Sequence, residues 1–302
     1  MAGNFVQLHN HTHYSLLDGA SKVPDLVKRV KELGMPAVGI TDHGNMHGAY
    51  ELWRAAVDSG VKPIIGIEAY VTPETARQDK TRVSWDTNWT PVPGHARNPD
   101  DVSGGGLITH LTMWAENDEG LVNLIKASSV ANLEGRVMRY PRMDKEVLST
   151  YSKGVIASSG CPSGIIQTRL RLGQFDEALR AAGEFQDIFG KDNFYIELMD
   201  HGLSIESKVT GDLLTIAKKL GAPLLATNDS HYVMEADKDA QDAMLCINSG
   251  ATLDDPNRFK FEGSGYYIKS AEEMRELFKD HPDACDNTLE IAERCNVIFD
   301  DH

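Results

Sequence analysis

The sequence is poor in cysteine, in long apolar runs and in positive charge, and each shortage excludes a class of protein. Four cysteines among 302 residues, with no C-x-x-C pair, are too few and too scattered for a disulfide framework. Lysine and arginine number 30 against 45 acidic residues, and the net charge of −15 argues against a surface that holds nucleic acid by charge alone. Bound metal ions can supply positive charge locally, so a nucleic-acid substrate is not excluded.

The apolar residues are spread along the chain in short runs. No run approaches the roughly 20 residues that cross a bilayer, and residues 1–14 contain neither an apolar nor a basic leader. We therefore expect no membrane partner, and the cysteine usage predicts a reducing, cytoplasmic setting. Hydrophobic residues are 41% and charged residues 25% of the chain, which is the composition of a folded globular protein.

Seven short apolar runs alternate with amphipathic helical patterns. The predicted strands cover residues 5–9, 37–41, 63–71, 107–114, 154–158, 194–199 and 223–227. Strands separated by helices predict parallel pairing with right-handed crossovers. A barrel and an open doubly wound sheet both fit this pattern, and the polar residues at the strand ends favour the barrel.

Two stretches depart from this pattern. Residues 72–106 are polar and rich in proline and glycine, which predicts a long mobile loop beside the active face. From residue 254 the pattern changes to two helices. We therefore expect a barrel over residues 1–253 and a helical extension over 254–302.

Residues that commonly bind metals occur at or near the ends of nearly all the predicted strands. His9 and His11 lie two apart in a strand, so both imidazoles face the same side. Glu68 lies inside an apolar run, where a carboxylate is costly unless it is paired or metal-bound. The other candidates are Asp18, His43, His110, Cys161, Asp229 and His231. Each alone could be a core or turn residue, but the strand ends of a parallel barrel meet on one face, so together they predict one site.

The donor types restrict the choice of ion. Imidazoles with one thiolate and bridging carboxylates suit zinc, with iron or manganese as alternatives, and disfavour an oxygen-only magnesium site. The number of donors predicts more than one ion. Ions about 3.5–4 Å apart can hold a phosphate, generate hydroxide near neutral pH and stabilise a leaving oxygen.

Several segments resemble the PHP (polymerase and histidinol phosphatase) domain family. The chain is most similar to the branch in the alpha subunit of bacterial replicative DNA polymerase III, of the actinobacterial kind. The segments are LHNHTHYSLLDGA, GITDHGNMHGA, KPIIGIEAYV, THLTMWAEN, SGCPSG, ELMDHGLSIE, ATNDSHYV and FKFEGSGYYIKSAEEM. The last two distinguish it from free-standing PHP phosphatases. His13 departs from the acidic residue expected at its position, and we assign it no role.

This resemblance implies a distorted seven-stranded (β/α)7 barrel, similar to a TIM barrel, that holds three divalent ions, with Zn²⁺ preferred and Mn²⁺ or Fe²⁺ as alternatives. One ion would use His9, His11, Glu68 and Asp229; a second Glu68, His110 and Cys161; a third Asp18, His43 and His231. All nine positions carry ligand-type residues, which favours a working catalytic site.

The resemblance also implies an activity and partners. We expect a 3′→5′ exonuclease that proofreads a DNA primer end, with the rest of the polymerase, the sliding clamp and other replisome proteins as partners. Arg142, Arg169 and Arg171 are candidate phosphate contacts, although solvated helix charges explain them as well. The polymerase palm is absent, so we expect no DNA synthesis. The alternatives are a phosphomonoesterase of the histidinol-phosphatase type and a metal-stabilised, non-catalytic scaffold for the polymerase.

Overall fold

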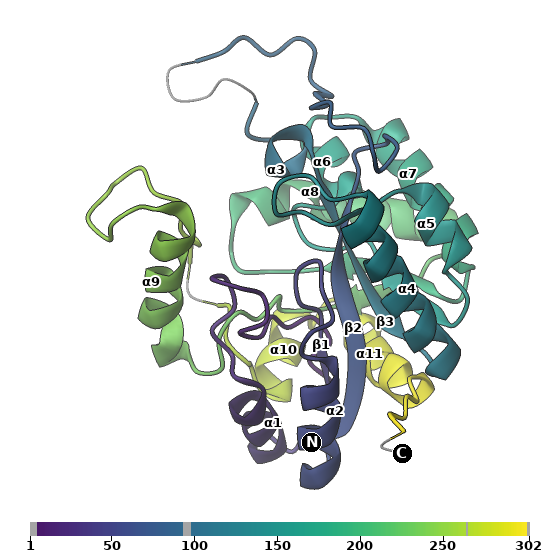
Figure 1. Ribbon diagram of the computed structural model, residues 1–302, viewed down its shortest axis with the longest axis vertical. Coiled ribbons are helices and arrows are strands. Elements are labelled where there is room, and N and C mark those ends of the chain that lie inside the picture. The colour runs from purple at the N-terminus through teal and green to yellow at the C-terminus, as the bar shows by residue number, and fades with distance from the viewer. Residues whose placement is uncertain (1–4, 93–97, 264, 301–302) are drawn as a thin grey trace.

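The short apolar runs of the sequence form a curved sheet, and the amphipathic stretches form helices around it (Figure 1). The computed structural model describes residues 5–92, 98–263 and 265–300. Its strands are β1 (Ala37–Ile40), β2 (Lys62–Val71), β3 (Thr109–Ala115), β4 (Arg142–Met143), β5 (Val155–Ser158), β6 (Phe194–Leu198) and β7 (Leu224–Ala226). All except the two-residue β4 coincide with predicted strands to within two residues at either end.

Helices precede, separate and follow the strands. They are α1 (Val23–Glu32), α2 (Ala49–Ser59), α3 (Ser103–Gly106), α4 (Asp118–Glu134), α5 (Lys145–Thr150), α6 (Ile165–Arg171), α7 (Phe175–Phe189), α8 (Ser204–Leu220), the 3₁₀ turn η1 (Glu235–Asp237), α9 (Lys238–Ser249), α10 (Ala271–Leu277) and α11 (Pro282–Arg294). Within the described residues, no helix is long and apolar enough to cross a membrane. Figure 1 shows α9 standing apart from the helices that flank β2 and β3.

The sheet curls until its two edges are linked. The strand order is β1-β2-β3-β5-β6-β7, with β4 paired to β2. Residues 5–11, which include the first predicted strand, form isolated bridges and run between β1 and the segment after β7. The Gly39 N–H donates to the Gln7 carbonyl at 2.8 Å, and the His11 N–H donates to the Ser230 carbonyl at 2.8 Å. This arrangement confirms the predicted distorted α/β barrel.

The direction of β3 differs from the prediction. We expected parallel strands throughout, but β3 is antiparallel to both β2 and β5. The reason is the connection between β2 and β3, whose only helix in its described part is the four-residue α3, so the chain re-enters the sheet at the end where it left. Tyr70, near the end of β2, therefore pairs with His110, near the start of β3. This reversal brings His110 level with side chains that follow the other strands.

An apolar cluster fills the opposite end of the barrel. Alternate residues of the strands point inward and meet the last helix, forming a cluster of Val6, Leu8, Ala37, Ile64, Trp114, Ile156, Tyr195, Leu225, Ile291, Ala292 and Cys295. Their sequence neighbours, such as Ile65 and Val155, belong to a second cluster that packs against the outer helices. One end of the barrel is thus closed by hydrophobic packing, and the other end contains the polar residues.

Helix α11 closes the apolar end of the barrel, and we call it the plug. The Thr288 hydroxyl accepts from the Val6 N–H at 3.1 Å, and the Asn287 amide donates to the Leu224 carbonyl at 2.7 Å. These bonds join the C-terminal segment to the N-terminal segment of residues 5–11 and to β7. The domain boundary predicted between residues 253 and 254 stays a prediction.

The long connection after β2 is fastened in its described part. The Asp101 carboxylate accepts from the Trp85 N–H at 2.7 Å and the Asp86 N–H at 3.1 Å. The Arg169 guanidinium of α6 lies 3.8 Å from the centre of the Trp85 ring. These contacts hold the connection against α6, while its predicted mobility stays a prediction.

The plug supports a stability prediction. Ile291 is fully buried in the inner cluster, so Ile291→Ala should lower the free energy of unfolding by about 3 kcal/mol through lost burial and a cavity. The control is Ile298→Ala, because Ile298 is 70% exposed and should change stability by less than about 0.5 kcal/mol. Urea unfolding measures both. Equal losses in the two variants would contradict the plug.

Candidate metal centre

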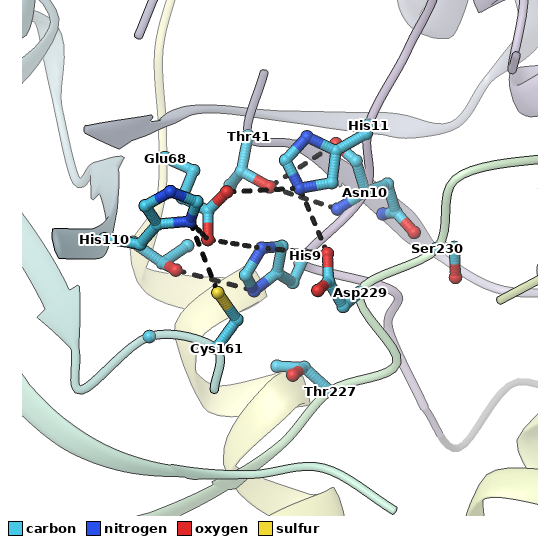
Figure 2. Close-up of polar contacts among 12 residues, drawn as sticks. His9, Asn10, His11, Thr41, Glu68, His110, Cys161, Thr227, Asp229 and Ser230 are labelled. Atoms are coloured by element: carbon cyan, nitrogen blue, oxygen red, sulfur yellow. Dashed lines mark hydrogen bonds and ion pairs between the residues drawn. The ribbon is translucent and has the colours of Figure 1, made fainter. Parts of the chain in front are cut away.

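The nine residues predicted as ligands come together at the polar end of the barrel. They are contributed by the N-terminal segment, by β2 and β3 and by the ends of three other strands: His9, His11, Asp18, His43, Glu68, His110, Cys161, Asp229 and His231. Figure 2 shows His9, His11, Glu68, His110, Cys161 and Asp229 pointing toward a common space.

Two imidazoles and two carboxylates form the first neighbourhood. The Nε2 atom of His9 lies 3.5 Å from Glu68 Oε1 and 3.4 Å from Asp229 Oδ1. The Nε2 atom of His11 lies 3.0 Å from the same Asp229 oxygen and 3.5 Å from Glu68 Oε2. Ligand atoms of His9, His11 and Asp229 all lie within 4.8 Å of one another, which suits a single ion.

Two further neighbourhoods flank the first one. On one side, His110 Nδ1 lies 3.2 Å from Glu68 Oε1 and 3.4 Å from Cys161 Sγ. On the other, Asp18 Oδ2 lies 2.8 Å from His43 Nε2 and 3.5 Å from His231 Nε2. These contacts bring together the residues of the second and third ligand sets that the resemblance implies, and their role as ligands stays a prediction.

His43 lies between the second and third neighbourhoods. Its Nδ1 atom is 2.6 Å from Glu68 Oε2, and it groups with Glu68 and His110 as well as with His11 and His231. The resemblance had placed His43 only in the third set. The geometry therefore makes the three neighbourhoods one continuous centre rather than separate sites.

The unpartnered atoms of this centre fit a group of cations. Several nitrogen and oxygen atoms are buried and make no hydrogen bond with the described residues: His9 Nε2, His11 Nε2, His43 Nδ1, both carboxylate oxygens of Glu68, Asp229 Oδ1 and His231 Nε2. Leaving such atoms unsatisfied costs about 1–3 kcal/mol each. Because they all face the same space, divalent ions would satisfy them together.

The imidazoles differ in charge within the metal-free pocket. Burial, together with His43 and His231, lowers the pKa of His11 to about 3, so its ring is neutral and can donate a lone pair. Burial also disfavours charge on His9, but the Glu197 and Asp229 carboxylates outweigh it and raise its pKa well above the usual value. In the same way Tyr70 and Glu68 raise the pKa of His43 against its burial.

The thiol of Cys161 is also protonated without a metal. Burial raises its pKa well above the usual value, and the neighbouring carboxylates of Glu68 and Asp229 act in the same direction. A thiolate at this position therefore needs a cation beside it.

Glu197 orients His9 and was missed by the sequence analysis. Its Oε1 atom lies 2.7 Å from His9 Nδ1, and the carboxylate also accepts from the Ser158 and Thr227 hydroxyls. A carboxylate behind a metal-binding imidazole fixes the ring and its tautomer. The signal was available, because Glu197 is an acidic residue inside an apolar strand, like Glu68.

Asp42 supports His11 through a serine and was also missed. The Ser15 hydroxyl lies 2.9 Å from His11 Nδ1 and donates to Asp42 Oδ1 at 2.9 Å. The same carboxylate accepts the Thr12 N–H at 2.7 Å. Asp42 directly precedes His43, and its side chain turns away from the centre to hold the N-terminal segment in place.

Asp229 holds its position with a strained backbone. Its φ of 45° lies in the left-handed region, which is uncommon for a residue other than glycine. The neighbouring Ser230 N–H donates to the His9 carbonyl at 3.1 Å, and the Asp229 carbonyl lies 2.7 Å from His231 Nδ1. Both contacts help to hold this conformation, which places the Asp229 and His231 side chains in one centre.

Arg139 is a cation at the rim that the sequence analysis did not single out. Its guanidinium lies 5.4 Å from the Tyr140 ring centre and donates to the Asn248 side chain at 2.5 Å. Tyr140, together with the charges of Tyr70 and Asp18, raises the pKa of Arg139. Tyr70 also stacks on His43 with ring centres 5.9 Å apart, so this rim adjoins the metal centre.

The three arginines predicted to contact phosphate are engaged elsewhere. Arg142 is fully buried and donates to the carbonyls of Arg77, Asp79, Leu107 and Gly135. Arg169 contacts Gln174 and Glu74, and Arg171 donates to the Pro162 carbonyl and lies 3.4 Å from Asp100. A substrate cannot reach Arg142, so the structure does not support its predicted phosphate contact. Arg169 and Arg171 are also buried in contacts that fasten α6 and the long connection.

Comparisons with known proteins give the family model and the relatives that this chain is similar to. The model of the PHP domain family matches residues 7–201. Over 98% of its length the chain is 53% identical to DNA polymerase III subunit alpha of Mycobacterium leprae and 55% identical to that of Saccharopolyspora erythraea. It covers 25% of each, so the chain spans about a quarter of the length of these curated relatives. Among solved structures, an amidohydrolase from Chromobacterium violaceum matches with a TM-score of 0.44 and 15% identity, over 75% of this chain and 87% of that one.

The protonated groups of the pocket predict how metal binding depends on pH. The raised pKa values of His9 and His43 stabilise the metal-free protein below about pH 6.5, and this contribution is lost as the pH rises through those values. Metal must displace these protons and that of Cys161, so Zn²⁺ should raise Tm more at about pH 8 than at about pH 6. Thermal scans measure this, and titration calorimetry in two buffers counts the protons. Metal binding without proton release would contradict it.

Proposed function

This chain belongs to the PHP domain family, and from that premise we propose that it is the PHP part of a bacterial DNA polymerase III alpha subunit and acts as a metal-dependent 3′→5′ DNA exonuclease. The observation that carries this proposal is the convergence of all nine ligand-type residues, with buried nitrogen and oxygen atoms that make no hydrogen bond with the described residues and face one space.

The donor set suits three divalent ions, for which we propose Zn²⁺, with Mn²⁺ or Fe²⁺ as alternatives. The proposed ligands are those of the three neighbourhoods: His9, His11, Glu68 and Asp229; Glu68, His110 and Cys161; and Asp18, His43 and His231. When bound, such ions withdraw charge from a phosphodiester and lower the pKa of water.

The reaction is hydrolysis of the last phosphodiester of a DNA strand. The oxygen of water forms a bond to phosphorus, the bond from phosphorus to the preceding 3′ oxygen breaks, and that oxygen takes up a proton. The products are a nucleoside 5′-monophosphate and a strand shortened by one residue. The protein's part is to hold the phosphate in line, and Glu197 and Asp42 keep His9 and His11 fixed for this purpose.

The acidic surface agrees with a domain that does not hold DNA by itself. A net charge of −15 repels the DNA backbone, so the primer end must be delivered by the rest of the polymerase in the cytoplasm, with the sliding clamp and other replisome proteins acting through that larger chain. We place Arg139, rather than the three buried arginines, beside the incoming phosphate.

The metal centre yields an activity prediction. On a primer with a 3′ mismatch, Asp229→Asn and His11→Ala should each reduce shortening by at least about 10²-fold, because each removes a donor that faces the phosphate site. His13→Ala is the matched control, since that imidazole lies outside the nine-residue set and should leave the rate unchanged. A denaturing gel with zinc or manganese present measures the products.

Three outcomes of the gel assay separate the alternatives. Unchanged primer length in protein that demonstrably holds metal would contradict the exonuclease. Release of phosphate from small monoesters without primer shortening would support a phosphomonoesterase instead. If chelation of the metal lowers Tm and the protein shows neither activity, the result would support the metal-stabilised scaffold.

Arg139 supports a second prediction. Arg139→Ala should raise KM for the primer about ten-fold and leave kcat nearly unchanged, because the guanidinium attracts phosphate without touching the reacting atoms. Arg136→Ala is the control, since Arg136 is an exposed arginine in the same turn. Equal KM values for the two variants would contradict a phosphate contact by Arg139.

A further inference from the structure

A second cavity adjoins the metal centre and is not used by the ligands. It has a volume of about 480 Å³ and lies between α9 and a segment that includes residues 258–263 and Tyr266. Its walls include Tyr232, Gln241, Lys260, Phe261 and Tyr266. A volume of this size suits one small organic molecule and not a nucleic-acid duplex.

Two wall residues connect the cavity to the metal centre. The Phe261 ring lies edge-on to His231, with ring centres 4.6 Å apart. The Gln241 amide donates to the Asp18 carbonyl at 3.1 Å. His231 and Asp18 both belong to the third neighbourhood, so the cavity begins one side chain away from it.

Phe261 and Tyr266 form an aromatic wall of the cavity, and neighbouring residues hold both in place. Phe261 packs on Tyr266 with ring centres 4.8 Å apart, and Tyr266 stacks on His201 at 4.0 Å. The Arg258 guanidinium and the Asp242 carboxylate form two hydrogen bonds of 2.5 and 2.6 Å, which fasten the segment that carries Phe261 to α9. A planar ligand in this cavity therefore meets an ordered aromatic surface.

The cavity wall combines aromatic and polar side chains. Phe261 and Tyr266 line it together with Gln241 and Lys260. An aromatic wall beside polar side chains suits a flat heterocycle with hydrogen-bonding edges.

We propose that this cavity binds the base of the 3′-terminal nucleotide, with Phe261 as the stacking surface, while the 5′-phosphate of that nucleotide lies at the metal centre. This inference rests on the proposed exonuclease function and specifies its substrate subsite. The cavity has room for a base that has left its stack and not for a duplex. Aromatic stacking recognises any base, which proofreading requires.

Titration calorimetry on the metal-loaded chain tests the subsite with two probes. Thymidine 5′-monophosphate carries a base and deoxyribose 5-phosphate does not. We expect wild-type protein to bind the first about ten-fold more tightly, the size of one base–aromatic stack. Phe261→Ala should abolish this difference and leave deoxyribose 5-phosphate binding and metal content unchanged.

Matched variants distinguish stacking from packing. Phe261→Tyr should retain the ten-fold preference and Phe261→Leu should lose it, since only the tyrosine keeps an aromatic face. Ile247→Ala is the control, because Ile247 is 67% exposed on α9 and does not line the cavity. A preference for the base that survives in Phe261→Ala would overturn the subsite.

The outcomes also separate this inference from the function on which it rests. If wild-type protein binds both probes equally while still shortening primers, the subsite is wrong and the exonuclease stands. If neither probe binds and primers stay intact in metal-loaded protein, both proposals fail.

Discussion

The polar end of the barrel depends on one buried carboxylate. Glu68 lies in the middle of β2 and is 1% exposed, and neither oxygen makes a hydrogen bond with the described residues. Imidazole nitrogens of His9, His11, His43 and His110 nevertheless approach it within 2.6–3.5 Å. A carboxylate in this position is tolerable only if cations share it, either protonated imidazoles or metal ions. The fold has to bring three separate segments to this one side chain.

The barrel meets that requirement by placing apolar side chains at one end and the charged residues at the other. Alternate strand residues fill the sealed end with apolar side chains, and α11 completes the seal from outside the sheet. The packing energy therefore comes from a region remote from the charges. The cost of the strained Asp229 backbone and of the unsatisfied donors can be offset there. The reversed direction of β3 adds His110 to the polar end, which a parallel β3 would have carried to the other.

Local sequence patterns predicted the positions of the strands and of the ligand-type residues, because both follow from the order of apolar and polar residues within a short segment. Apolar runs marked six strands, and paired histidines or carboxylates at their ends marked the ligand-type residues. Strand direction was missed because no residue of 72–106 reveals at which end the chain re-enters the sheet. Glu197 was missed although it shares the signal of Glu68, an acidic residue inside an apolar strand. Asp42 was missed because it supports His11, distant in sequence, through the Ser15 hydroxyl. Arg142 was predicted as a phosphate contact because its actual partners are main-chain carbonyls, which the sequence pattern does not reveal.

In the proposed exonuclease, the acidic charge of the chain and the small cavity would together favour frayed primer ends. A chain of net charge −15 cannot draw a paired primer terminus out of a duplex by backbone attraction. A cavity of about 480 Å³ admits a base only after that base has left its stack. Unstacking costs a few kcal/mol for a paired terminus and least for a mismatched one. The proposed exonuclease would therefore discriminate through the fraying of the primer end, with no need to recognise the mismatch itself.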